Sequence, residues 1–411
     1  MSTQEPSPSI FRSIGPGLVS AASDNDPTTV ASLAVIGSTT IYGLSWLVIL
    51  VIPMLVTVQT IGAQVGAVCK AGLETVVLRR FGRTWAFVML LAVLGVNIIT
   101  LTADIEGGAA ALQLLFHQNW QWFVIPFATG TALLLVYGNY DVLQHVLKWV
   151  ALVFLAYVVS AFLARPDWGE VLRQTFVPHF ERNNAYATGA VALLGTTLTS
   201  YAYVWETIEV AEERPPLRRL GLVRADAAIG MIFAGIIFWF IVITTGATLG
   251  VHHKDVQTAQ DAAAALIPIA GPFAGIVFGI GLLASAALAV PVLAGTSAYV
   301  MTQAFGIRGD LNLPFARAPR FYYSLIATLV VSVVIAFIGV SPIKLLLYAS
   351  IAGAFGTPIT LMLLMLAARD KQVMGTHRIG RLPTAAGWTV TAIVVLACVV
   401  FLWQSMTSGG S

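Results

Sequence analysis

The chain has 411 residues, of which 58% are hydrophobic and 10% are charged, and its mean hydropathy is +0.85. Because soluble domains carry about a quarter charged residues, this composition excludes a soluble globular protein and indicates a polytopic membrane protein. The formal net charge of +3 gives no support for a nucleic-acid partner, and Cys69 and Cys398 lack the spacing of metal ligands.

Apolar segments follow one another along nearly the whole chain. A membrane-spanning helix needs about 20 mostly apolar residues. By this measure we predict an all-α polytopic protein with a single transmembrane domain over residues 1–411. Its spans, about eleven in number, are expected near residues 13–40, 44–68, 85–115, 122–138, 143–164, 186–209, 221–250, 271–303, 321–340, 342–368 and 385–404.

A polar interruption divides the first of these segments. It reads Ser23-Asp24-Asn25-Asp26-Pro27-Thr28-Thr29 between apolar flanks. Pro27 has no backbone donor and disfavours helix at Asp26, so we predict two half-helices with a break here. A break exposes carbonyl oxygens, and carbonyls together with carboxylates suit a hard cation. The alternative is an N-cap on an extramembrane loop, with the span starting at Thr28.

Basic residues are distributed unequally between the predicted loops. With the N-terminus inside, the inner loops hold most of them, and the outer loops near residues 39–43, 116–121 and 340–343 hold no lysine or arginine. Cytoplasmic loops carry such an excess. We therefore expect a multi-pass protein of the inner or plasma membrane, with the N-terminus in the cytoplasm and the C-terminus outside. The inner-loop residues are Lys70, Arg79, Arg80, Arg83, Arg214, Arg218, Arg219, Arg308, Arg317, Arg320, Arg369, Lys371, Arg378 and Arg381.

Transporters are often built from two inverted repeats that each begin with a broken helix. If the first span begins one repeat, the sixth begins the other. The sixth contains Leu194-Gly195-Thr196-Thr197-Leu198-Thr199-Ser200-Tyr201, a glycine followed by β-branched and hydroxylated residues that favour helix only weakly. Taken alone, this run is also compatible with a continuous helix. Its matching position in the repeat favours a second break.

Carboxylates also occur in or near other apolar segments. Asp104 and Glu106 lie in the third span, and Glu206 and Glu209 follow the expected break in the sixth. Residues two apart on a helix point in different directions, so one of the first pair at most should face a site. An acid inside the membrane is a functional candidate by default. We expect Asp104 to face the cavity, on the same helix face as Asn97.

Several of these motifs resemble the NRAMP (SLC11-type) metal transporters. The resemblance starts with Gly15-Pro-Gly-Leu-Val-Ser-Ala-Ala-Ser-Asp-Asn-Asp-Pro-Thr-Thr, continues through Tyr42-Gly-Leu-Ser-Trp, Gln59 and Gly62-Ala-Gln-Val-Gly, and extends to Thr102-Ala-Asp104 and Leu194-Gly195-Thr196-Thr197. It implies a five-plus-five inverted-repeat fold of the LeuT/APC type with broken helices 1 and 6. The repeats would span about 13–165 and 186–368, with an extra helix near 385–404. It also implies a divalent cation held between the two breaks, and no enzymatic activity or cofactor.

The sequence departs from the family pattern at the positions that would bind the ion. Where manganese and iron transporters have asparagine in helix 1, this chain has Thr29; their helix-6 methionine is Thr199 and their helix-6 histidine is Tyr201. Gly107 replaces the second acid of the helix-3 pair. In these features the chain looks most like the NRAMP-related magnesium transporters, which implies a wider site for a hydrated ion and no obligatory proton coupling. Magnesium keeps several waters and prefers oxygen ligands, which fits the substitutions independently.

The expected ligand set is therefore made of oxygens. Asp26 is the main anionic ligand, and Thr29, a carbonyl near Ala22 or Ser23, and Thr196 or Thr199 supply further oxygens. The residues expected along the aqueous path are Asp24, Asn25, Asp104, Tyr201 and Glu206.

Our leading hypothesis is an importer of magnesium, with manganese as a second substrate, that works by alternating access. It lies in the lipid bilayer, and we expect no obligatory protein partner. A proton-coupled manganese or iron symporter is the alternative within the same fold. A non-transporting membrane sensor would be expected to carry a sizeable soluble output domain, and few residues follow the last predicted span. An intramembrane enzyme is disfavoured because no nucleophile or metalloprotease motif lies within a span.

Overall fold

The protein is almost entirely helical. The computed structural model describes residues 25–137, 155–181, 183–307 and 309–408, and contains no strand within these ranges. Residues 155–163 are helical. The α-helices are α3 (Pro27–Thr40), α4 (Ser45–Cys69), α5 (Leu73–Phe81), α6 (Arg83–Phe116), α7 (Gln121–Tyr137), α9 (Trp168–Phe176), α10 (Asn184–Thr197), α11 (Ser200–Glu213), α12 (Leu220–Thr248), α13 (Ala259–Ala263), α14 (Ile267–Ala270), α15 (Ala274–Ala304), α16 (Pro319–Ala336), α17 (Pro342–Arg369), α18 (Lys371–Met374) and α19 (Arg381–Ser408).

The helices reproduce the predicted order of spans. Within the described ranges seven helical stretches are long and apolar enough to cross a membrane, namely Ser45–Cys69, Arg83–Phe116, Leu217–His252, Ala259–Ala304, Pro319–Ala336, Pro342–Arg369 and Arg381–Met406. The shorter α7 is a further apolar helix, and α3 and the α10–α11 pair occupy the positions of the predicted broken spans. The first half of span 1 and most of span 5 lie outside the described residues. The predicted all-α polytopic fold is confirmed.

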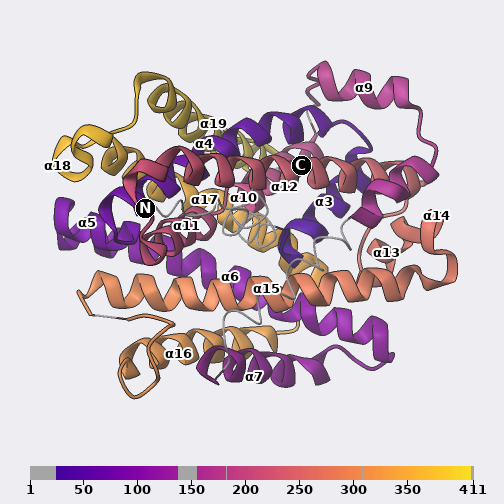
Figure 1. The fold of residues 1–411 in the computed structure, drawn as a ribbon. Helices are drawn as coiled ribbons and strands as arrows, with labels where there is room; N and C mark the ends of the chain where they lie inside the picture. The colour runs from indigo at the N-terminus through magenta and orange to yellow at the C-terminus, as the bar shows by residue number, and fades with distance from the viewer. Residues whose placement is uncertain (1–24, 138–154, 182, 308, 409–411) are drawn as a thin grey trace, which may run out of the picture.

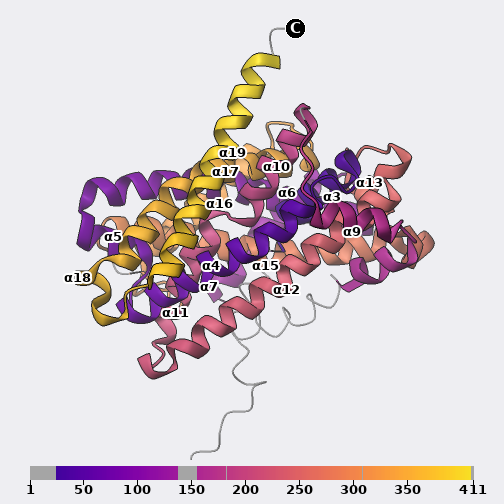
Figure 2. The ribbon, with the colours of Figure 1, turned by 90° about the horizontal axis from the view of Figure 1, so that it is seen from above.

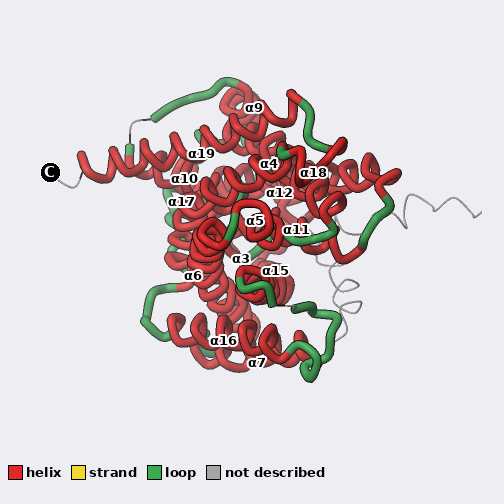
Figure 3. Tube along the Cα trace, turned by 90° about the vertical axis from the view of Figure 1, so that its left-hand side faces the viewer, coloured by secondary structure: helices red, strands yellow, loops and turns green. Residues whose placement is uncertain are grey.

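Helix α3 occupies the centre of the bundle. Viewed end-on, it lies among α6, α10, α12, α15 and α17, whereas α7 and α16 lie together at one outer edge (Figure 3). All residues of its first two turns, from Pro27 to Ala34, are buried. Helix α19 packs on α10 and α17, and its last turns extend beyond the bundle (Figure 2). A helix whose first turns are buried on all sides and whose N-cap is a buried carboxylate is thus placed where it can line an internal site.

The two ends of the bundle differ in charge. Helices α5 and α18 lie at the left end in Figure 1, and α9, α13 and α14 lie at the right end. At the left end the exposed Arg80 of α5 forms an ion pair of 2.7 Å with Asp370, which caps α18. Of the predicted inner-loop residues, Arg80 pairs with Asp370 here, and Lys70, Arg79 and Arg214 line a cavity beside α5, so we refer to this end as the basic end.

One buried acid lies in this region, outside the spans. Glu74, in the first turn of α5, is 0% exposed, and neither carboxylate oxygen has a hydrogen-bond partner among the described residues. Burial raises the pKa of Glu74 to about 9. This carboxyl is therefore protonated at neutral pH.

Candidate cation site at the two helix breaks

The first break is formed by the start of α3. Asp26 has extended backbone dihedrals and is the N-cap of α3, and its Oδ1 accepts a hydrogen bond of 2.6 Å from the main-chain N–H of Thr29. Pro27 occupies the first helical position, where its missing N–H costs nothing. Asp26 is only 1% exposed. The N-cap that we considered as an alternative is therefore present, but it lies inside the bundle and not on an external loop.

The second break lies between α10 and α11, as predicted. Leu198 and Thr199 are non-helical, and the carbonyl of Leu198, which the helix no longer uses, accepts a hydrogen bond of 3.0 Å from Thr357 of α17. Gly195 allows α10 and α17 to touch here, because a Cβ at this position would lie 1.9 Å from the carbonyl oxygen of Ser350. The break therefore forms without proline, through a partner helix that satisfies the freed backbone.

The two breaks are joined by hydrogen bonds. The Tyr201 hydroxyl, in the first turn of α11, donates to Oδ2 of Asp26 at 2.8 Å. The Thr29 and Thr196 hydroxyls are 2.8 Å apart, which links α3 to the end of α10. The end of α10 also presents main-chain carbonyls, the negative end of the helix dipole. Four predicted residues, Asp26, Thr29, Thr196 and Tyr201, are thus brought together.

Thr199 lies in the second break itself. It is 4% exposed, and its Oγ1 has no hydrogen-bond partner among the residues that the structure describes. A buried hydroxyl without a partner costs free energy, so this oxygen is available to a water molecule or an ion.

Asp104 approaches the first break from α6. Its Oδ1 accepts two hydrogen bonds from Thr28, one of 3.0 Å from the main-chain N–H and one of 2.6 Å from the hydroxyl. Its Oδ2 has no partner within the described ranges. Gly107 is required here, because a Cβ would lie 2.8 Å from the Cβ of Pro27. The packing of α6 against Pro27 therefore explains why no second acid occupies position 107.

Other contacts at the breaks gave no signal in the sequence. Ser285 of α15 donates to the main-chain carbonyl of Asn25, and the Ser32 and Ser350 hydroxyls, on α3 and α17, are 2.6 Å apart. Single serines in apolar helices are common and usually bond to their own helix. Only the folded structure shows that these two pairs hold the first break against its neighbours.

The remaining predicted residues have different positions. Asn25 is buried at the start of the described chain, and Glu206 is buried in α11, one turn beyond Tyr201. Ala22, Ser23 and Asp24 lie outside the described residues. The described part of the chain holds no cluster of three or more His, Cys, Asp and Glu side chains. A cation at Asp26 would therefore be surrounded by hydroxyl, carbonyl and water oxygens, an environment suited to hard ions.

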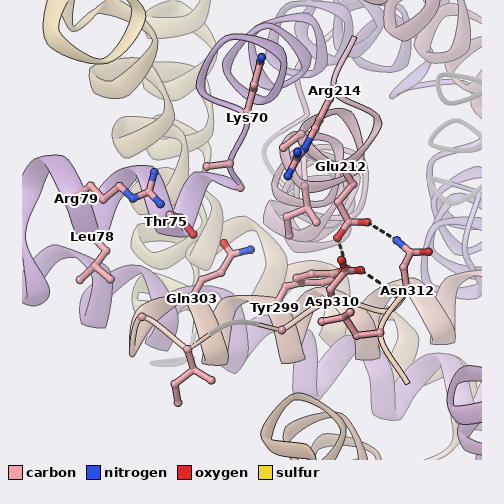
Figure 4. Close-up of a pocket in the computed structure, with 18 residues that line it drawn as sticks. Lys70, Thr75, Leu78, Arg79, Glu212, Arg214, Tyr299, Gln303, Asp310 and Asn312 are labelled. Carbon is pink, nitrogen blue, oxygen red and sulfur yellow. Dashed lines mark hydrogen bonds between the residues drawn. The ribbon is translucent and has the colours of Figure 1, made fainter. Parts of the chain in front are cut away.

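A cavity of about 690 Å³ opens at the basic end of the bundle, beside the end of α11 (Figure 4). On one side the Tyr299 hydroxyl donates to Glu212 and accepts from the main-chain N–H of Leu311 at 2.9 Å, and the Asn312 amide approaches Glu212 at 3.4 Å. Basic residues line the other side. The labelled lining residues are Lys70, Thr75, Leu78, Arg79, Glu212, Arg214, Tyr299, Gln303, Asp310 and Asn312.

Comparison with known proteins gives a consistent result. Residues 17–404 match the model of the Nramp family, described as natural resistance-associated macrophage protein-like. The divalent metal cation transporter MntH of Deinococcus radiodurans is 27% identical over 408 residues, covering 95% of this chain and 89% of the relative. MntH of Ralstonia nicotianae is 29% identical over 424 residues, covering 96% and 91%.

Solved structures agree on the fold. A manganese transporter from Eremococcus coleocola, solved with an aromatic bis-isothiourea compound, superposes with a TM-score of 0.78 at 17% identity, covering 100% of this chain and 91% of the other. The structure of MhsT in complex with L-phenylalanine superposes with a TM-score of 0.65 at 13% identity, covering 98% of this chain and 99% of the other. The chain belongs to the Nramp family, whose members are metal-ion transporters and not enzymes.

Proposed function

We propose that this protein is a divalent metal importer that carries Mg²⁺, with Mn²⁺ as a second substrate, by alternating access. The ion is held between the breaks of helices 1 and 6, with Asp26 as the anionic ligand. Thr29, Thr196 and Thr199 and a carbonyl near Ala22 or Ser23 supply oxygens directly or through water. The repeats that rock against each other cover about 13–165 and 186–368.

The observation that carries this proposal is the chemistry of the second break. Thr199 lies where manganese and iron transporters of the family have methionine, and its buried hydroxyl has no partner among the described residues. Around Asp26 the recorded contacts are the Thr29 amide and the Tyr201 hydroxyl, with no sulfur. Mg²⁺ dehydrates reluctantly and takes oxygen ligands, whereas a thioether favours softer metals.

The path and the orientation belong to the same proposal. Helix α11 runs from Tyr201 at the site to Glu212 at the basic-end cavity, with Glu206 and Glu209 between them. We assign the basic end to the cytoplasm because cytoplasmic loops carry the excess of lysine and arginine. Asp24, Asn25 and Asp104 would attract cations near the site, and the cavity would release them into the cell. The C-terminus then lies outside.

A proton-coupled manganese symporter is the second candidate. It is favoured by the relatives, which carry the name divalent metal cation transporter MntH, and by the fold of the Eremococcus manganese transporter. The absence of the family's histidine at Tyr201 disfavours it, because a phenol does not exchange a proton near neutral pH as imidazole does.

Uptake into proteoliposomes separates these candidates. Purified protein is reconstituted, Mg²⁺ and Mn²⁺ uptake are measured with internal pH recorded in parallel, and Asp26→Ala is the control. We expect uptake of Mg²⁺ without acidification, and its loss in Asp26→Ala. Uptake of Mn²⁺ alone, with acidification, would establish the symporter instead. Uptake of neither ion would contradict both.

A further inference from the structure

The Tyr201 hydroxyl of α11 donates a hydrogen bond of 2.8 Å to Asp26 at the start of α3. We propose that Tyr201 is a positioning residue whose hydroxyl replaces the departed cation at Asp26, so that the empty protein can return across the membrane without a second ion. The inference rests on the proposed function, since it assigns a step in the transport cycle to the site at the two breaks.

An ionised carboxylate without a counter-charge is costly in the centre of the bundle. Asp26 is 1% exposed in the centre of the bundle, and an isolated carboxylate there is strongly disfavoured. A transporter that releases its cation and carries nothing back must compensate this charge by other means. Neutral hydrogen-bond donors can do so, because bonds to a charged acceptor are roughly twice as strong as neutral ones.

The structure supplies one donor to each oxygen. The Thr29 N–H is 2.6 Å from Oδ1 and the Tyr201 hydroxyl is 2.8 Å from Oδ2. The Thr29 donor belongs to the backbone of α3 and moves with Asp26. Tyr201 belongs to α11, across the second break, so it is the donor that can withdraw when an ion arrives.

The position of Tyr201 also links the two broken helices. Its bond to Asp26 joins α3 to α11, while the bond between the Thr29 and Thr196 hydroxyls joins α3 to α10. Both halves of helix 6 are therefore held against helix 1. A bound cation would connect the same helices, because oxygens from both breaks would coordinate it. After the ion has left, the Tyr201 hydroxyl thus keeps α11 connected to α3 in place of the ion.

Exchange and net uptake distinguish this role from that of an ion ligand. Net uptake requires the empty protein to return, whereas exchange of labelled for unlabelled Mn²⁺ across a loaded vesicle does not. In Tyr201→Phe, which removes the hydroxyl and keeps the ring, we expect net Mn²⁺ uptake to fall at least about tenfold and exchange to fall far less. This is the loss of about one charge-assisted hydrogen bond, since 1.36 kcal/mol corresponds to tenfold.

Tyr203→Phe is the matched control. Tyr203 lies two residues away in α11, is 1% exposed, and its hydroxyl bonds to the carbonyl of Thr357 at 3.3 Å and not to Asp26. We expect its ratio of net uptake to exchange to equal that of the wild type.

Each remaining outcome overturns the inference. If net uptake and exchange fall equally in Tyr201→Phe, the residue is an ion ligand or a purely structural one. If neither falls, the hydroxyl has no role in the return step. If the wild type shows neither net uptake nor exchange of Mn²⁺ or Mg²⁺, the proposed function itself fails, which is distinct from a failure of Tyr201 alone.

Discussion

The contact between α10 and α17 at Gly195 predicts a large effect of a single methyl group. In Gly195→Ala the added Cβ would lie 1.9 Å from the Ser350 carbonyl oxygen and 2.5 Å from the Ala354 nitrogen. Both are backbone atoms of a buried helix, so neither can rotate away. An ordinary contact is 3.4 Å or more, so α10 would have to move away by about 1.5 Å. The hydrogen bond from Thr357 that supports the second break would be lost with it.

The magnitude follows from this geometry. Overpacking a well-packed core costs typically about 1–3 kcal/mol and occasionally more. The loss of one buried hydrogen bond adds about 1 kcal/mol. The gain in helix propensity from glycine to alanine returns about 1 kcal/mol. We therefore expect Gly195→Ala to lower the free energy of unfolding by about 1–3 kcal/mol.

Thermal unfolding of the purified protein in detergent measures this loss of stability. The readout is the fraction of protein that stays monodisperse as the temperature rises. Gly95→Ala is the control, because Gly95 lies in α6 with no atom within 4 Å of its added Cβ. We expect Gly95→Ala to match the wild type or exceed it slightly. Equal stability of Gly195→Ala and Gly95→Ala would refute the close helix contact and the account of the second break that depends on it.

Three further predictions concern single side chains. Thr199→Met should raise Mn²⁺ or Cd²⁺ uptake relative to Mg²⁺ uptake by about tenfold, because a thioether favours softer metals. Thr199→Val adds no sulfur and should leave this ratio unchanged. Equal uptake ratios for the two variants in a competition assay would contradict the assignment of Thr199 to the site. Thr28→Val removes the 2.6 Å hydrogen bond to Asp104 and should lower the free energy of unfolding by about 1.5–3 kcal/mol, whereas Thr28→Ser should lower it little. Thermal unfolding of the two variants measures this difference, and equal stability would contradict it. The pKa of Glu74 is raised to about 9, so its contribution to stability is fully present below about pH 4.5 and is lost as pH rises toward 9. Glu74→Gln should remove this slope of about 1.4 kcal/mol per pH unit between pH 5 and 9, and a slope unchanged in the variant would show that Glu74 does not titrate there.

Local chemistry is enough to predict the order of the spans and the first break. Pro27 lacks a backbone N–H in any surroundings, so the start of α3 at this residue could be predicted from the sequence. The break at Thr199 has no such marker. It was predicted only because the repeat places it opposite the first, and the structure shows that Thr357 stabilises it.

Contacts between distant segments could not be predicted in the same way. Asp104 was expected to face the cavity, but its two bonds from Thr28 depend on how α6 packs against α3. Ser285 and Asn25 are 260 residues apart in the chain, and nothing near either residue indicates the other. The position of Tyr201 on Asp26 likewise follows from the assembled bundle. A single sequence reports the chemistry of a residue, whereas these pairs are set by tertiary packing.

Anomalous diffraction from crystals grown with Mn²⁺ would locate a divalent cation in the proposed position between the two breaks. We expect one strong anomalous peak beside Asp26, at about 2.1–2.2 Å from its carboxylate if the ion is bound directly or at about 4 Å if a water intervenes. The peak should be absent in Asp26→Ala. A peak only in the basic-end cavity, beside Glu212 and Asp310, or no peak near Asp26 at any occupancy, would contradict it.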